Sequence, residues 1–163
     1  VRASDWEQEL YRMGVPPQVK VVFASVAEAA AQLAGWSAGE QKGIVLTGDV
    51  ERRQAIRDEL HAARGVHAPD LLTLEVLAAL ARATRRKAMT APEQQAALEA
   101  YASLRISRHR SHPLWPRIAR LTTRHTAYDA AYVALAEMLD APLLTTDARL
   151  ARAVTTINVI DLA

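Results

Sequence analysis

The sequence has no cysteine, few aromatic residues and no long apolar run. Aromatic residues make up 5% of the 163 positions. Without thiols the chain has no cysteine nucleophile, no Cys-ligated zinc and no disulfide, which fits a reducing compartment. No stretch approaches the ~20 apolar residues that span a bilayer. The start, Val1-Arg2-Ala3-Ser4, is not that of a signal peptide. We therefore expect a cytoplasmic protein with no membrane partner.

Several common binding motifs are also missing. The chain has no Gly-rich phosphate loop, and its histidines do not show the spacing of a zinc site. What is present is an ordinary globular mixture, because 50% of the residues are hydrophobic and 23% are charged. This length suits one domain, or one domain with an appendage.

Charge is distributed unevenly along the chain. The formal net charge is only +2, but acidic residues outnumber basic ones in residues 1–60 and the reverse holds afterwards. Between positions 82 and 124 the only acids are Glu93 and Glu99. This basic stretch predicts a face that binds a polyanion, although solvated helix surfaces would give the same pattern.

Predicted strands alternate with predicted helices, which indicates an α/β fold with a mostly parallel sheet between helical layers, a three-layer sandwich. Capping boxes, in which a Ser or Thr is followed three residues later by Glu, mark several helix starts. The expected strands are 19–24, 43–47, 66–68, 105–107, 142–146 and 157–160. The expected helices are 5–13, 25–34, 51–64, 71–87, 90–104, 114–123, 127–139 and 147–153.

Three acids lie at or near predicted helix starts among apolar neighbours: Glu75, Asp129 and Asp147. An isolated buried carboxylate is costly, and carboxylates brought together repel one another unless a cation compensates them. A hard divalent cation does this best, so the pattern suggests a Mg²⁺ or Mn²⁺ site and phosphodiester chemistry. Asp147 directly follows a predicted strand, where ligands bind in open parallel sheets, and Thr145 or Thr146 could position a phosphate or a water there.

Each acid also has a purely structural explanation. Thr146 or Asp147 could simply cap the next helix. Asp129 fits a capping box with Thr126, where the helix dipole stabilises an acid without any ligand. Glu75 could be a polar-facing residue on its helix.

Residues 54–163 resemble the PIN domain, and in particular the toxin ribonucleases of VapB–VapC toxin–antitoxin pairs. The likeness rests on the segments 66–77, 121–136 (with its Thr-Ala-Tyr-Asp-Ala-Ala-Tyr core) and 141–147. It implies a PIN fold and an endoribonuclease that depends on Mg²⁺ or Mn²⁺. It also implies three partners: RNA, an antitoxin peptide that covers the site, and a second copy of the chain. The implied catalytic residues are Glu75, Asp129, Asp147 and Thr146, and the candidate RNA-binding residues are Arg85, Arg86, Lys87, Arg108 and Arg110.

Residues 1–53 resemble part of a different protein, the mannose/sorbose-type enzyme IIB of the sugar phosphotransferase system. The likeness rests on the segments 13–21, 25–30 and 43–51, and it lacks that family's phosphorylated histidine because the first histidine is His61. We therefore predict a chimera in which the α/β segment 1–53 completes the sheet of a PIN-like domain, 54–163.

The first acid of PIN toxins normally ends the first strand. Here Asp49 follows a predicted strand but lies closer to His67 than in the family pattern. Asp49 is therefore a substitute for the fourth metal ligand, a displaced acid or a bystander. The alternative to a working ribonuclease is an engineered or recombined scaffold with no catalytic activity.

Overall fold

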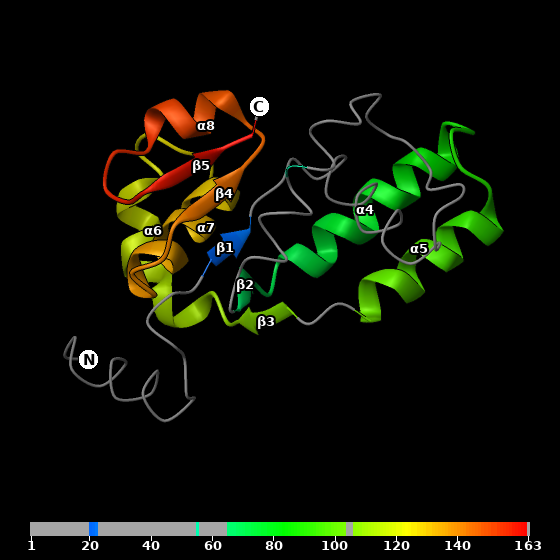
Figure 1. Cartoon of the computed structure of the whole chain (residues 1–163), viewed down its shortest axis with the longest axis horizontal. Coiled ribbons are helices and arrows are strands. Elements are labelled where there is room, and N and C mark those ends of the chain that lie inside the picture. The colour runs from blue at the N-terminus through cyan, green and yellow to red at the C-terminus, as the bar shows by residue number, and fades with distance from the viewer. Residues whose placement is uncertain (1–19, 23–54, 56–64, 104–105, 163) are drawn as a thin grey trace.

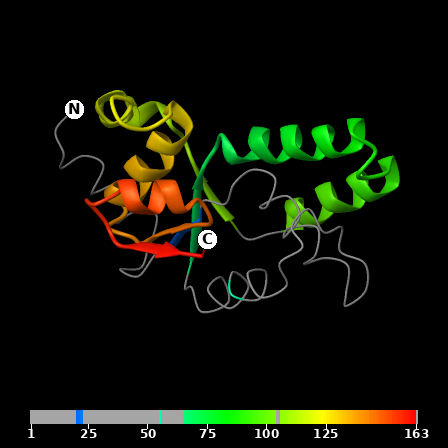
Figure 2. The ribbon, with the colours of Figure 1, turned by 90° about the horizontal axis from the view of Figure 1, so that it is seen from above.

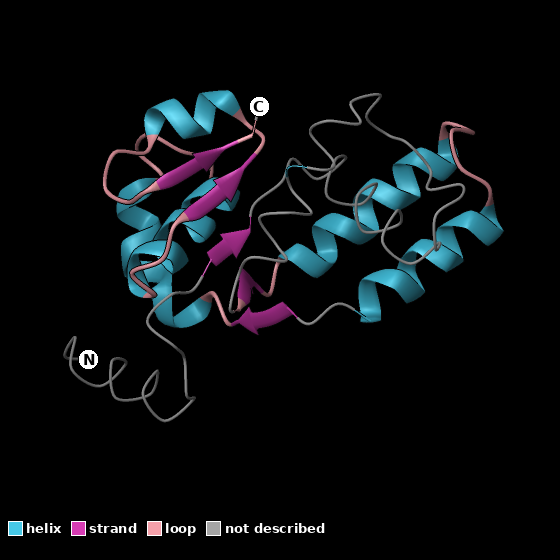
Figure 3. Cartoon of the chain, in the orientation of Figure 1, coloured by secondary structure: helices cyan, strands magenta, loops and turns pink. Residues whose placement is uncertain are grey.

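A computed structural model describes residues 20–22, 55, 65–103 and 106–162 (Figures 1 and 3). Five strands form one sheet in the order β3-β2-β1-β4-β5, and every neighbouring pair is parallel. The predicted α/β fold with a parallel sheet is therefore confirmed. The strands are β1 (Lys20–Val22), β2 (Val66–Pro69), β3 (Ile106–His109), β4 (Leu143–Thr145) and β5 (Val159–Asp161).

The N-terminal part of the chain contributes the central strand. In the register of the sheet Val21 lies opposite His67 of β2 on one side and opposite Leu143 of β4 on the other. Residues 20–22 therefore share a sheet with the C-terminal part, and the division of the chain into 1–53 and 54–163 stays a prediction. The predicted strand at 43–47, the predicted helices at 5–13 and 25–34, most of the one at 51–64, and Asp49 lie outside the described residues.

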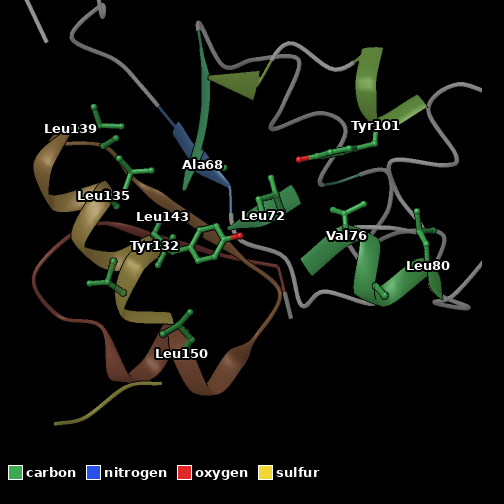
Figure 4. Close-up of a cluster of buried hydrophobic side chains, with 14 of the residues drawn as sticks. Ala68, Leu72, Val76, Leu80, Tyr101, Tyr132, Leu135, Leu139, Leu143 and Leu150 are labelled. Carbon is green, nitrogen blue, oxygen red and sulfur yellow. The ribbon is translucent and has the colours of Figure 1, made fainter. Parts of the chain in front are cut away.

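Strands β2 and β4 are almost entirely buried, which is typical of a parallel sheet with both faces covered. All three residues of β4 are buried, as are the last three of β2. Around them Tyr132, Leu135 and Leu143 are fully buried in one hydrophobic cluster (Figure 4). This cluster packs the helix before β4, α7 (Ala127–Met138), against the sheet.

After β2 the chain forms two long helices, α4 (Leu72–Arg85) and α5 (Ala91–Ser103). Residues Leu72, Val76 and Leu80 of α4 recur at helical spacing and are buried. The helix ends two residues before its predicted end because Lys87 adopts a left-handed conformation, with φ 57°, and Ala88 donates back to the carbonyl of Ala83.

The predicted capping box before α5 is confirmed. The amide of Thr90 and its hydroxyl both donate to Glu93 Oε2, at 2.8 and 2.7 Å.

The remaining helices are η1 (His112–Leu114), α6 (Trp115–Leu121), α7 (Ala127–Met138) and α8 (Ala148–Ala153). Helix α7 contacts β1, β2 and β4, while α8 contacts β4 and β5. In the described part of the chain no helix is both long and apolar enough to cross a bilayer.

The helices take the sides of the sheet that right-handed crossovers require. In the strand order, the connection from β2 to β3 moves toward the β3 edge of the sheet, whereas the connections from β3 to β4 and from β4 to β5 move toward the β5 edge. Helices α4 and α5 therefore lie on one side of the sheet, from which they extend away, and α6, α7 and α8 group on the other (Figure 2).

Candidate active site

The three predicted acids come to the same edge of the sheet, where the parallel strands end. Glu75 lies in the first turn of α4, just after β2, and Asp147 lies two residues after the end of β4. Asp129 lies in the first turn of α7, which leads back into the start of β4, so this helix also begins at that edge. We call Glu75, Asp129 and Asp147 the acidic edge.

Asp147 caps helix α8. Its Oδ1 accepts hydrogen bonds from the amides of Arg149 (2.8 Å) and Leu150 (3.2 Å). The amide of Asp147 in turn donates to the hydroxyl of Thr145, at 3.0 Å. The structural explanation for this acid is thus correct, but it uses only Oδ1. The other oxygen, Oδ2, lies 3.5 Å from the guanidinium of Arg149.

Asp129 also forms the capping interaction with Thr126 that would explain it without a ligand. Its amide donates to the hydroxyl of Thr126, the N-cap of α7, at 3.1 Å. Its carboxylate is different, because the side chain is only 10% exposed and its cationic contact in the described part of the chain is Arg149, at 3.9 Å. The Arg149 side chain is itself 75% exposed. A carboxylate this deep with one loosely held cation is poorly compensated.

Glu75 is held by a tyrosine from the opposite helical layer. Tyr132, fully buried on α7, donates a hydrogen bond of 2.6 Å to Glu75 Oε2. Burial raises the pKa of Glu75; the Tyr132 hydrogen bond lowers it and the charge of Asp129 raises it, and the net shift is upward. Burial and the hydrogen bond to Glu75 raise the pKa of Tyr132 as well, so this phenol stays a donor.

A second tyrosine reaches the same region from α5. The hydroxyl of Tyr101 shares a hydrogen bond of 2.9 Å with Thr73, two residues before Glu75. It also accepts a hydrogen bond of 3.1 Å from Nε of Arg108, whose guanidinium lies over the Tyr101 ring at 4.8 Å. Tyr101 and Tyr132 extend from opposite sides toward the beginning of α4 (Figure 4). Arg108 is therefore held near the first turn of α4.

The donor chemistry of the acidic edge suits a hard cation, which prefers carboxylate oxygens. Among the described residues, however, no three His, Cys, Asp or Glu side chains are grouped closely enough to hold one ion. The acids instead form two adjoining pairs, Glu75 with Asp129 and Asp129 with Asp147. A pair is compatible with Mg²⁺, which is usually bound through one or two carboxylates with waters and substrate phosphates.

The other predicted site residues lie at different distances from this edge. Thr146 is buried beside Asp147. Arg85, Arg86 and Lys87 are exposed at the far end of α4, about 15 Å from Glu75 along the helix axis. Arg110 is exposed just after β3. The RNA-binding role of these residues stays a prediction.

Sequence reasoning gave no role to Tyr132 or Arg149. The signal for Tyr132 was its spacing, because residues three apart on a helix share a face and Asp129 precedes it by three. The signal for Arg149 was a cation in the first turn of α8, where the helix dipole does not favour one.

Comparison with known proteins identifies relatives of this chain. The model of the PIN domain family matches residues 44–155. Ribonuclease VapC9 of Mycobacterium tuberculosis is 36% identical over 105 residues, which cover 64% of this chain and 79% of the relative. Ribonuclease VapC3 of the same organism is 44% identical over 107 residues, covering 63% and 74%. These matches give no support to the likeness of residues 1–53 to enzyme IIB, and the chimera stays a prediction.

Proposed function

The chain belongs to the PIN domain family, and we propose that it is an endoribonuclease of the VapC toxin type that requires Mg²⁺ or Mn²⁺. One observation carries the proposal. Three carboxylates from separate elements lie as two adjoining pairs where the strands end, and the most buried of them, Asp129, has only a loosely placed cation within the described residues. Such a group is stabilised by an external cation.

We propose that Glu75, Asp129 and Asp147 are the metal-binding acids, that an ion is held by an adjoining pair of them, and that Asp49 is the candidate fourth ligand. When bound, a divalent ion lowers the pKa of water and offsets the charge that develops on a phosphodiester. The protein keeps its own oxygens in place for that purpose. The cap bonds of α8 fix Asp147, and the Tyr132 hydroxyl fixes one oxygen of Glu75.

The proposed substrate is an RNA strand that reaches the acidic edge beside Arg108. Its stacking on Tyr101 and its bond to the Tyr101 hydroxyl hold the guanidinium in place, which suits it to bind a phosphate. Thr146, buried next to Asp147, is proposed to position the substrate or the attacking water.

The proposed partners follow from the VapC relatives: an antitoxin peptide that covers the acidic edge, and a second copy of the chain. Leu74 and Leu77 of α4 are 70% and 41% exposed, which supports a protein contact on that helix. The cytoplasmic location stays a prediction.

A cleavage assay tests the function. Single-stranded and structured RNA are incubated with the protein in Mn²⁺, in Mg²⁺ and in EDTA, with Asp129→Asn beside wild type. We expect metal-dependent cleavage that the variant loses by roughly 10²–10³-fold, the cost typical of removing one electrostatic group from a catalytic site.

The matched control is Asp140→Asn, which makes the same chemical change at an exposed position after α7. Asp140 has φ 46°, a conformation that Asn tolerates. We expect it to cleave like wild type. Wild-type protein that leaves RNA intact in every metal supports the inactive scaffold instead, and cleavage by Asp129→Asn at the wild-type rate contradicts the assignment of the site.

A further inference from the structure

A pocket of about 280 Å³ lies between α6, α7 and the residues that follow α8. None of the three acids lines it. Its walls carry Arg117, Arg120, Arg124 and His125, and its apolar surface includes Leu121 and Val133. We call it the basic pocket.

The basic pocket is built on a rigid frame. Arg117 donates two hydrogen bonds to Glu137, at 2.6 and 2.7 Å, which join α6 to α7. Thr156 donates to the same carboxylate at 2.6 Å and ties the segment after α8 to this pair. Three separate parts of the chain are thus fixed around the cavity before any ligand arrives, which lowers the entropy lost on binding.

Two arginines on this frame keep their charge available. Arg120 and Arg124 are exposed, and neither has a carboxylate within 4 Å among the described residues. Glu137 neutralises Arg117, so the pocket keeps a positive charge from the other two. Among the described residues the three arginines of the pocket share one carboxylate, Glu137, so the concave site carries excess positive charge. Such a site favours an anion that accepts several hydrogen bonds, and phosphate fits this best.

The position of the basic pocket relates it to the acidic edge. Val133 lies one helical turn after Asp129 on the same face of α7, and Val154 lies two turns after Asp147 along α8. The pocket therefore begins roughly 5–10 Å from the acids along these helices. His125 bridges the two regions, because it lines the pocket and immediately precedes Thr126, the N-cap of α7.

We propose that the basic pocket binds a phosphate of the RNA strand close to the one held at the acidic edge, with Arg120 and Arg124 as its ligands. The apolar wall contacts the adjoining sugar or base. This inference rests on the proposed function, since it assigns a second contact to the same substrate.

Binding without cleavage tests it. The affinity of a short, fluorescently labelled single-stranded RNA is measured by anisotropy at several salt concentrations, in EDTA and in the Asp129→Asn background. Adding Arg120→Ala and Arg124→Ala should weaken binding on the order of tenfold, and reduce the slope of log K against log salt by roughly 0.7 for each lost phosphate contact. Arg120→Lys with Arg124→Lys should recover part of the slope, because the charges remain.

The control removes two arginines that are exposed outside the pocket, Arg82→Ala with Arg152→Ala. We expect it to change affinity and slope much less. Equal weakening by the control overturns the proposal in favour of general charge. A lower melting temperature with unchanged affinity in the pocket variant overturns it too, because the arginines then only stabilise the helix ends around them.

A parallel titration with inorganic phosphate and with a mononucleotide separates the sources of the phosphate. The RNA assignment is contradicted if inorganic phosphate or the mononucleotide stabilises wild type while the pocket variants bind RNA as tightly as wild type does. RNA affinity is measured separately from RNA cleavage, so the two proposals can fail separately. If the protein binds RNA through the pocket but does not cleave it, this inference stands and the proposed function fails. If the variant without Arg120 and Arg124 cleaves RNA as fast as wild type and binds it as tightly, this inference alone is overturned.

Discussion

Two half-buried glutamates at different places in the fold, Glu137 and Glu75, have pKa values shifted in opposite directions. Burial alone would raise the pKa of Glu137, but hydrogen bonds from Arg117 and Thr156 and the nearby charge of Arg120 hold it below its ordinary value. For Glu75, burial and the charge of Asp129 outweigh the hydrogen bond from the neutral Tyr132 hydroxyl, so its pKa is raised. The frame of the basic pocket is therefore balanced within the protein, while among the described residues the acidic edge keeps excess negative charge. That difference separates a region that holds the fold together from the region that we propose accepts a cation.

The largest expected effect that separates the two glutamates is on RNA cleavage. Glu75→Gln keeps the size of the side chain and an oxygen for Tyr132, but removes a charge that the proposed metal needs. We expect a loss of roughly 10²–10³-fold. Glu137→Gln should stay within a factor of about ten, the effect expected of a group that acts only through packing and substrate affinity. Initial cleavage rates at saturating Mn²⁺ measure both effects. Equal losses in the two variants would contradict the assignment of different roles to Glu75 and Glu137.

For the stability of the fold the order should be reversed, with the larger loss in Glu137→Gln. The lowered pKa of Glu137 means that its charged form contributes stability above its ordinary pKa of 4.5, which is lost as pH falls. Glu137→Gln should therefore destabilise the protein at neutral pH by about 1.5–3 kcal/mol, the usual value for hydrogen bonds to a charged group.

For Glu75 the raised pKa means that stability is present below 4.5 and lost as pH rises through the folded-state value. In the absence of metal, Glu75→Gln should then raise the urea midpoint at pH 7. A lower midpoint for Glu75→Gln would show that this acid is a structural residue after all.

The hydrogen bond from Tyr132 gives a smaller effect that sharpens the account of Glu75. Because this bond lowers the pKa of Glu75, Tyr132→Phe should raise that pKa further and move the acid limb of cleavage to higher pH. The profile of kcat/KM against pH measures the shift. A variant that loses activity equally at every pH would assign Tyr132 to packing alone.

The smallest effect comes from two histidines on neighbouring strands. His67 Nδ1 lies 2.7 Å from His109 Nε2, and burial together with the nearby charge of His109 lowers the pKa of His67 from 6.5 to about 4. A lowered histidine pKa gives stability that is present above 6.5 and lost as pH falls toward 4. About 2 kcal/mol is lost between pH 7 and pH 5, so the melting temperature should drop by about 4–8 °C. His109→Gln, which keeps a hydrogen-bonding partner for His67, should flatten this dependence.

Local signals explain what the sequence could predict. The caps at Thr90, Thr126 and Asp147 involve residues within three positions of one another, so their spacing alone indicates them. The shared edge of the three acids follows from parallel strands, which all end on one side of a sheet.

What could not be predicted depends on residues far apart in the sequence. Tyr132 meets Glu75 across 57 positions, because the helices on the two sides of the sheet converge at its edge. Arg149 reaches Asp129 only because α7 and α8 begin side by side. The frame around the basic pocket likewise joins Arg117, Glu137 and Thr156 from three elements.

Binding of Mn²⁺ tests the central claim most directly, which is that the acidic edge is left uncompensated in order to hold a divalent ion. The melting temperature is measured against Mn²⁺ concentration for wild type, Glu75→Gln and Glu137→Gln, starting from metal-free protein. An ion that binds only the folded state stabilises it in proportion to its affinity. We predict a saturable rise for wild type and Glu137→Gln and none for Glu75→Gln. The same rise in all three proteins, or no rise in wild type, would contradict the account.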